Sequence, residues 1–305
     1  MIGKTRQKPS KAKAPKVEEI YDPEVGKGRG MLRRPLSEGK MRHVRRSPAA
    51  DLSTWIAHYW MIQWDLRGCE PHIAESLPHP NVHVIFEPRA SVVCGVHTSK
   101  FSRLLEGQSQ VFGVKFKPGA FRPFFKSQVS KLANRMVPVK SIFGKDVEGL
   151  QTIVLSSRGE DEKVEAANAF FRARMPKSDK TVDLVAKLVQ QILDDRDIKT
   201  VEDLAAKTST GKRSLQRLFN EYAGVSPKWV IQRYRLHEAI EQAHSKKKLD
   251  WSQLALDLGY FDQAHLINDF RALTGYSPTE YQALTTNAEE KKLARNVTVK
   301  HGNER

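Results

Sequence analysis

The chain has 305 residues, a formal net charge of +16 and an isoelectric point near 9.8. This length allows two domains with separate cores, and the positive charge favours a polyanionic partner such as nucleic acid. The sequence lacks a transmembrane-length apolar run and a signal peptide, and its two cysteines are too few for a disulfide scaffold, so we expect a cytoplasmic protein without a membrane partner.

Residues 1–48 are rich in Lys, Arg, Pro and Gly and show no sustained hydrophobic period. Residues 1–50 hold 14 Lys and Arg against 5 Asp and Glu, a net charge of 14 − 5 = +9. Such a segment buries too little apolar surface to offset its chain entropy, so we predict a disordered basic arm over 1–48. The arm either adds non-specific phosphate contacts or is a solubilising or misannotated leader.

Residues 49–177 predict a β-rich domain that acts in sensing or dimerisation. Alternating or branched runs separated by Pro, Gly and Ser indicate strands, and an amphipathic helix is expected over 161–174. The strands are expected over 55–64, 81–86, 91–96 and 110–116.

Several residues of this domain invite a sharper interpretation. His79, His83 and Glu87 are spaced four apart, but four residues of strand cover ~13 Å, too far for the two histidines to share a metal. We therefore expect no metal and no cofactor. Cys69 and Cys94 form either a redox pair or two ordinary thiols. The aromatic residues form either core or the lining of an effector pocket: Trp55, Tyr59, Trp60, Trp64 and Phe86.

Residues 178–286 predict an all-α domain in which short helices alternate with tight turns. An amphipathic helix over 181–194 precedes two short helices over 201–220, and Leu215 and Phe219 mark the buried face of the second. The opposite face carries cations and planar amides, which suit the major groove: Lys212, Arg213, Ser214, Gln216 and Arg217. The region holds 15 Lys and Arg against 15 Asp and Glu, so its attraction for phosphate must be local.

The pattern recurs about fifty residues later. Leu215 corresponds to Leu266, Phe219 to Phe270, and Ser226-Pro227 to Ser277-Pro278, while the outward residues differ. Two copies of one structural unit, directed at different targets, would leave this pattern in the sequence. In the second copy the outward residues are Gln263, Ala264, His265 and Asn268.

These motifs resemble a known family. The run L-x-R-x-F-x4-G-x-S-P from Leu215 to Pro227 is similar to the first helix-turn-helix of AraC/XylS-type transcription regulators, and the run from Gly259 to Pro278 is similar to the second. The segments LPHPNVHVIFEP, VFGVKFKPGAFRPFF and VPVKSIFG resemble the N-terminal domain of one subgroup. The resemblance implies sequence-specific recognition of double-stranded promoter DNA, RNA polymerase as a protein partner, and a domain that senses a small molecule or mediates homodimerisation.

The fold class that follows is α+β: a disordered basic arm, a β-rich domain, an all-α domain with two helix-turn-helix units joined by a linker helix, and a flexible tail over 287–305. A linker helix from Pro227 to His244 would span ~27 Å and place two helices in successive major grooves, which lie ~34 Å apart. Because the second unit has Asn268 where the family commonly has a basic residue, we expect the first to supply most of the affinity.

Two functions remain open. The first is a DNA-binding transcription regulator controlled through its N-terminal domain. The second is an interaction protein that keeps the helix-turn-helix scaffold but acts by contacting RNA polymerase or another regulator. No phosphate-binding loop, nucleophile elbow or spaced carboxylate pair occurs, so we do not expect an enzyme.

Overall fold

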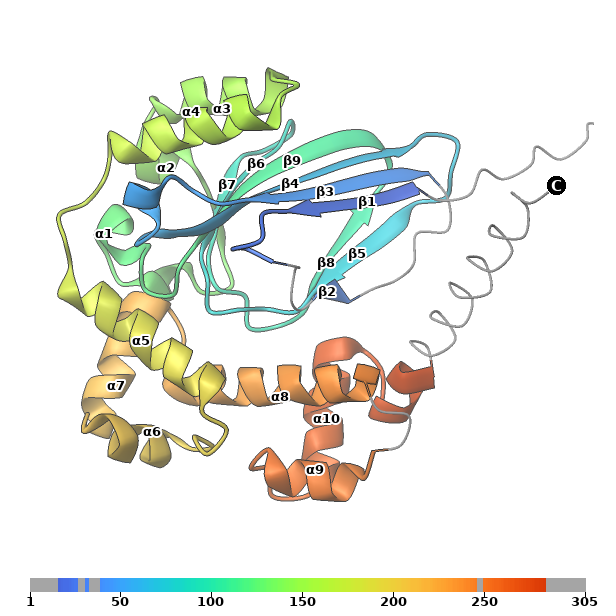
Figure 1. Ribbon diagram of the computed structural model, residues 1–305, viewed down its shortest axis with the longest axis vertical. Helices are drawn as coiled ribbons and strands as arrows, with labels where there is room; N and C mark the ends of the chain where they lie inside the picture. The colour runs from blue at the N-terminus through green and yellow to red at the C-terminus, as the bar shows by residue number, and fades with distance from the viewer. Residues whose placement is uncertain (1–15, 27–30, 33–38, 246–248, 284–305) are drawn as a thin grey trace, which may run out of the picture.

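A seven-stranded sheet is the centre of the N-terminal half in the computed structural model, which describes residues 16–26, 31–32, 39–245 and 249–283 (Figure 1). β1 pairs with β3 in parallel and the other neighbours are antiparallel. The strands, in spatial order, are β1 (Lys16–Tyr21), β3 (Lys40–Arg46), β4 (Ile56–Leu66), β9 (Gly107–Phe116), β6 (His83–Phe86), β7 (Val92–Cys94) and β10 (Met136–Pro138).

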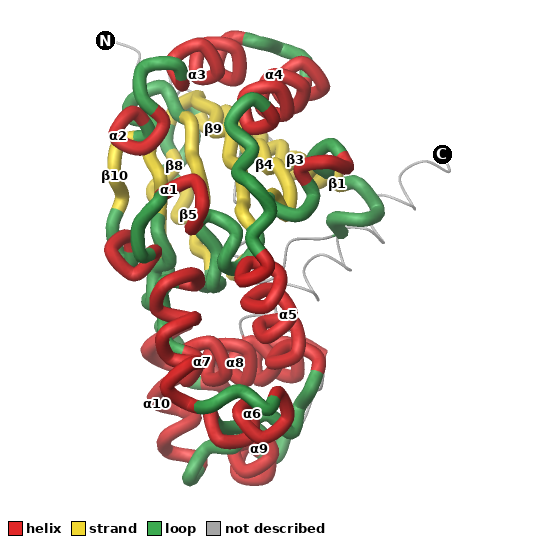
Figure 2. The backbone as a smooth tube through the Cα atoms, turned by 90° about the vertical axis from the view of Figure 1, so that its left-hand side faces the viewer, coloured by secondary structure: helices red, strands yellow, loops and turns green. Residues whose placement is uncertain are grey.

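Helices cover one face of this sheet (Figures 1 and 2). Aromatic side chains fill the space between the helices and the sheet; Phe116 of β9, for example, lies 5.5 Å from Phe171, centroid to centroid. Tyr59 is fully buried there and donates its hydroxyl proton to Asn168 at 2.9 Å. The helical elements are η1 (Ala50–Leu52), α1 (Arg122–Phe125), η2 (Val129–Leu132), α2 (Lys140–Phe143), α3 (Val147–Ser156) and α4 (Glu160–Arg172).

A three-stranded sheet of β2 (Met31–Leu32), β5 (His72–Ser76) and β8 (Phe101–Leu105) packs over the other face. A smaller core between the two sheets includes Trp64 and Leu105. Gly113 of β9 makes room for an indole here, because a Cβ atom at this position would lie 2.0 Å from the Trp60 ring. The two sheets thus enclose a partly polar interior.

The predicted α+β class, with a β-rich N-terminal half and an all-α C-terminal half, is confirmed. One correction concerns the arm: the prediction of disorder over 1–48 is wrong for β1 and β3. Both strands carry few apolar residues, and pairing with distant strands stabilises them instead of local hydrophobic pattern. Residues 1–15 and the predicted tail over 287–305 lie outside the described residues. The domain limits at 177 and 286 stay predictions.

The C-terminal half contains helices arranged around one long helix, α8 (Pro227–Ser245). α6 and α7 lie near its first half, and α9 and α10 near its second (Figure 1). The elements are α5 (Lys180–Asp194), α6 (Val201–Thr208), α7 (Lys212–Leu218), the π-helical turn η3 (Phe219–Ala223), α8, α9 (Trp251–Asp257) and α10 (Gln263–Thr274). No described helix has both the length and the apolar character needed to cross a bilayer.

The two halves contact each other through side chains placed next to both helix-turn-helix units. Val96 belongs to the core of the first unit, and Leu77 belongs to the core of the second. Arg233 of α8 donates to the Thr98 carbonyl at 2.9 Å. Gly224, which ends η3 with a φ of +82°, lies so close to Val129 of η2 that a Cβ atom would come within 2.9 Å of its side chain.

Arg235 joins α5 to α8. Its side chain is buried, and one guanidinium nitrogen donates to the carbonyl oxygens of Ile192, Asp195 and Ile198 at 3.0, 2.6 and 3.0 Å. These groups lie at and beyond the last turn of α5, where carbonyls lack helical partners and a positive charge is favourable. Arg235 of α8 therefore caps the C-terminus of α5.

We expect Arg235→Met to lower the free energy of unfolding by about 3 kcal/mol, because charge-assisted hydrogen bonds are lost and buried carbonyls are left unpaired. Arg196→Met is the matched control: its side chain is 76% exposed and pairs with Glu238, so its loss should cost below about 1 kcal/mol. Denaturant unfolding of both variants measures the difference. Equal losses would show that the carbonyl contacts of Arg235 do not stabilise the fold.

Candidate nucleic-acid interface

The first helix-turn-helix unit consists of α6 and α7 with its extension η3. Thr200 begins α6 with a capping box, in which its hydroxyl accepts from the Asp203 amide and the Asp203 carboxylate accepts from the Thr200 amide. Gly211 caps α7 in an extended conformation, as expected for this position. The side chains of Leu204, Leu215 and Phe219 are fully buried, and they orient the opposite face of α7 outward.

That outward face holds all five residues predicted for the first unit, and all five are exposed: Lys212, Arg213, Ser214, Gln216 and Arg217. Lys212 pairs with Glu202 of α6 at 2.6 Å, and this contact lowers the pKa of the Glu202 carboxyl group. Within the described ranges, Arg213 and Arg217 form no ion pair. Two guanidinium groups are therefore available to an external acceptor.

The second unit consists of α9 and α10. Asp250 caps α9, and Asp262 caps α10 by accepting from the His265 amide at 2.8 Å. Trp251 and Phe270 meet edge to face with ring centroids 5.9 Å apart in the core. The same arrangement as in the first unit, a buried stripe behind an outward face, is thereby repeated.

The four residues predicted for the second unit, Gln263, Ala264, His265 and Asn268, are also exposed. None of the four is Lys or Arg, so they offer weaker contacts to DNA than the residues of the first unit. The Gln263 side-chain oxygen already accepts from the Ser252 hydroxyl at 2.7 Å, so its amide nitrogen is the group left for a ligand. The imidazole of His265 lies 4.0 Å from the Asp269 carboxylate.

One exposed residue of this unit was missed by the sequence analysis. Phe261, immediately before the cap of α10, is 88% exposed. Its place next to the helix start is visible in the sequence, but an aromatic residue there would ordinarily be expected to pack against the helix.

α8 holds the two units at a fixed separation. Ser226 begins it by accepting from the Trp229 amide at 3.2 Å, and its 19 residues correspond to ~28 Å of helix. Figure 1 shows α7 near the first half of α8 and α10 near the second, and α6 and α9 lie on the side of α8 away from the sheets in both views (Figures 1 and 2). Beyond α10, Ser277 and Glu280 form a reciprocal cap: the Ser277 amide donates to the Glu280 carboxylate at 2.7 Å, and the Glu280 amide donates to the Ser277 hydroxyl at 3.3 Å.

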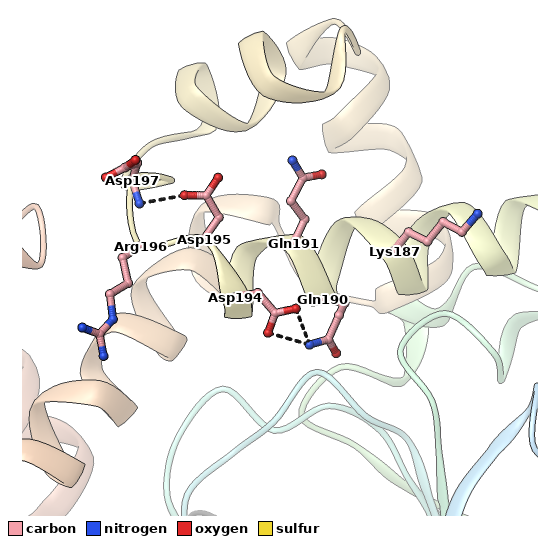
Figure 3. A pocket seen from close by; sticks show the side chains of 7 residues that line it. All are labelled: Lys187, Gln190, Gln191, Asp194, Asp195, Arg196 and Asp197. Atoms are coloured by element: carbon pink, nitrogen blue, oxygen red, sulfur yellow. Dashed lines mark hydrogen bonds between the residues drawn. The ribbon is translucent and has the colours of Figure 1, made fainter.

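A hollow of about 640 Å³ at the end of α5 is a poor site for nucleic acid (Figure 3). Three carboxylates line it and would repel phosphate. Gln190 donates to Asp194 at 2.8 Å, and the Asp195 carboxylate pairs with Lys207 at 2.6 Å. The lining residues are Lys187, Gln190, Gln191, Asp194, Asp195, Arg196 and Asp197.

In the N-terminal half, a polar row crosses the large sheet on its inner side. The strand register places His58 of β4 and His83 of β6 on either side of Lys115 of β9. Arg45 lies 2.7 Å from His58, measured from Nη2 to Nε2, and the Trp60 indole donates to His83 at 3.2 Å. We call His58, Lys115, His83 and Arg45 the polar row.

Burial controls the charges of the polar row. It lowers the pKa of His58 to about 2 and that of His83 to about 3, with Lys115 as the next cause in each case. Both imidazoles are therefore neutral at pH 7. Burial, and then the charge of Arg45, lowers the pKa of Lys115 to about 8. Across the described part of the chain, no carboxylate forms an ion pair with Lys115 or Arg45, so two partly buried cations lack a counter-charge.

α8 lies next to the polar row. His237 of α8 stacks edge to face on His79 with ring centroids 4.6 Å apart, and its pKa is lowered to about 3, first by burial and then by Arg233 and Lys115. An open cleft of about 930 Å³ lies elsewhere between the two sheets, with Trp64, Leu104 and the Arg103–Glu87 ion pair in its wall.

The remaining candidates of the N-terminal half have structural roles. Trp55, Tyr59, Trp64 and Phe86 are buried, although Trp64 also lines the open cleft. Cys69 and Cys94 are both free, and burial raises the pKa of Cys94 to about 11. His79 lies outside β6, and within the described segments no three His, Cys, Asp or Glu residues are grouped to hold a metal.

Two family models match parts of the chain. Residues 44–138 match a domain of unknown function, DUF6597, and residues 204–283 match a helix-turn-helix domain. No curated protein matches the chain.

Several solved structures resemble the chain at low identity. A structure of ToxT from Vibrio cholerae is 11% identical, with 70% of this chain and 98% of that chain covered and a TM-score of 0.35. An unsaturated fatty acid-bound wild-type ToxT from Vibrio cholerae is 14% identical, with 72% and 96% covered and a TM-score of 0.34. The xylose-binding transcription activator XylR is 15% identical, with 41% and 38% covered and a TM-score of 0.29. Scores of this size support neither a shared domain arrangement nor a shared ligand.

The helix-turn-helix match spans α6 to α10, the segment that carries both sequence motifs. Its caps, buried stripes and exposed faces occur twice, on either side of one continuous helix. Residues 204–283 therefore belong to a helix-turn-helix domain family, in the segment whose motifs resemble those of AraC/XylS-type transcription regulators.

Proposed function

We propose that the protein recognises two adjacent major-groove segments of promoter DNA, one with α7 and one with α10. The observation that carries the proposal is that each of these helices presents an exposed polar face at one end of the 19-residue helix α8. A spacer of ~28 Å is close to the ~34 Å that separates successive major grooves. One chain can then contact both segments without a dimer axis.

The two helices contribute unequally in this proposal. α7 carries Arg213 and Arg217, which can pair bidentately with guanine, and Gln216, which can pair with adenine. Arg271, in the last turn, is the only Lys or Arg of α10, and the basic side chain of its first turn is the imidazole of His265. α7 therefore supplies most of the affinity, and α10 adds discrimination between sequences.

Promoter fragments recovered by genome-wide mapping of bound sites provide the test. On such a fragment, Arg217→Ala should weaken binding by about 1–3 kcal/mol and Asn268→Ala by less, because only the arginine offers a charged bidentate contact. Lys187→Ala on α5 removes the same charge away from the proposed contacts and should leave specific affinity nearly unchanged. Quantitative footprinting at fixed salt measures all three.

A larger loss for Asn268→Ala than for Arg217→Ala would reverse the proposed division. If the affinity for the promoter fragment falls steeply with salt but equals the affinity for random DNA, the protein binds phosphate without recognising sequence, and the proposal is contradicted.

RNA polymerase is the protein partner we propose, because a promoter-bound regulator must act on transcription through it. Sedimentation of the full chain at increasing concentration tests self-association.

We also propose that the N-terminal half responds to a small anionic effector. The support is the polar row, in which the partly buried Lys115 and Arg45 form no ion pair with a carboxylate of the described residues. Buried charge of one sign is unfavourable, and an anion would relieve it. Since His237 of α8 lies close enough to interact with Lys115, an anion bound there would act directly on the helix that spaces the two DNA contacts.

The titration of Lys115 gives a test that needs no ligand. Its pKa is 10.5 in an unfolded chain and about 8 when folded, so between these values the unfolded chain holds a proton that the folded chain has lost. The free energy of unfolding should therefore rise with pH across this window, by on the order of 2–3 kcal/mol, and Lys115→Met should lack this rise. Lys131→Met, at an exposed site, should keep it.

Denaturant unfolding at pH 7 to 10.5 measures these slopes. A wild-type slope that Lys115→Met leaves unchanged would show that Lys115 is not a buried cation. Small carboxylates and phosphate esters, added at pH 7, should raise the melting temperature of the wild type and not that of Lys115→Met.

A further inference from the structure

Phe261 occupies the position just outside the N-terminus of α10. The next residue, Asp262, is the helix cap, and its carboxylate accepts from the His265 amide at 2.8 Å. Helix caps of this type are often accompanied by a contact between the residue before the cap and the fourth residue of the helix. Here the fourth residue is Leu266, which is fully buried.

Phe261 does not make that contact. Its side chain is 88% exposed, whereas the preceding Tyr260 is 7% exposed and packs edge to face on His265 with ring centroids 5.2 Å apart. Tyr260 thus provides the packing at the start of the helix, and Phe261 extends into solvent. Phenylalanine is among the residues most often buried, and of the exposed large apolar side chains in the described residues Phe261 has the largest exposed fraction.

The position of the ring indicates which ligand. The N-terminal residues of a recognition helix are those that contact base edges, and Phe261 adjoins Gln263, Ala264 and His265 at that end. This end of α10 has no Lys or Arg, so the bidentate guanine contact of an arginine is not available to it. The apolar contact that the major groove offers is the C5-methyl group of thymine, which Phe and Ala side chains recognise.

We infer that Phe261 is a specificity-determining residue of the second unit that recognises a thymine through its methyl group. This inference rests on the proposed insertion of α10 into the major groove. It makes the two units chemically different: α7 recognises bases through hydrogen bonds from Arg and Gln, and α10 recognises shape and a methyl group.

Replacing single thymines by deoxyuridine in a recovered promoter fragment removes the methyl group and leaves base pairing intact. For the wild type, one or two such replacements in the second segment should weaken binding about four-fold, as expected for one lost methyl contact. Phe261→Ala should weaken binding to the thymine fragment and lose all sensitivity to these replacements. Phe261→Leu should keep part of that sensitivity.

Leu256→Ala is the matched control, because Leu256 on α9 is also apolar and 55% exposed; it should retain the full sensitivity to deoxyuridine. Since Phe261 is exposed, its variants should have the wild-type melting temperature. If the wild type and Phe261→Ala lose the same affinity on deoxyuridine replacement, while both segments are footprinted, the inference is overturned. So would unchanged DNA binding by Phe261→Ala together with lost activation of purified RNA polymerase, which would assign the ring to a protein partner. A wild-type footprint confined to one segment would instead refute the proposed function itself.

Discussion

The arrangement of the C-terminal half depends on a buried guanidinium group. Arg235 of α8 binds three carbonyl oxygens at and beyond the end of α5, and Glu238, one turn further along α8, lies 3.6 Å from its other terminal nitrogen. The partial negative charge at a helix C-terminus makes this a favourable place for a buried cation. Because α5 also packs against the core of the first helix-turn-helix unit, the contact fixes that unit to α8. The second unit packs directly on α8, so one helix sets the geometry of both.

The N-terminal half is connected to that same geometry. It contributes Val96 to one helix-turn-helix core and Leu77 to the other, and the Thr98 carbonyl accepts from Arg233 between them. Lys100 extends the contact to the end of α10, where it lies 3.4 Å from the Thr274 carbonyl while pairing with the buried Glu75 at 2.7 Å. His237, on the same helix, lies close enough to the polar row for Lys115 to contribute to the lowering of its pKa. A change in the charge of that interior would therefore reach α8 through packed side chains rather than through a flexible linker.

Much of this molecule could be predicted from sequence, and the limits have physical causes. Caps at Thr200 and Asp262 were predictable because each side chain accepts from the amide three residues further on, and Gly211 is a residue type that often precedes a helix. β1 and β3 were not, since their sequences are polar and their strands exist through pairing with distant residues. The polar row was also hidden: His58, Lys115 and His83 are far apart in sequence, and only the register of β4, β9 and β6 brings them together. The exposure of Phe261 depends on Tyr260 taking the packing position, which the sequence pattern does not decide.

The shared cores have an evolutionary consequence. Val96 and Leu77 each fill a place in a helix-turn-helix unit that lies more than one hundred residues away in the chain. A recombination event that joined this DNA-binding half to an unrelated sensor would leave both places empty unless the incoming domain offered apolar side chains at matching points. The two halves are therefore constrained to diverge together, and substitutions at positions 77 and 96 should be accompanied by changes in the helices that surround them.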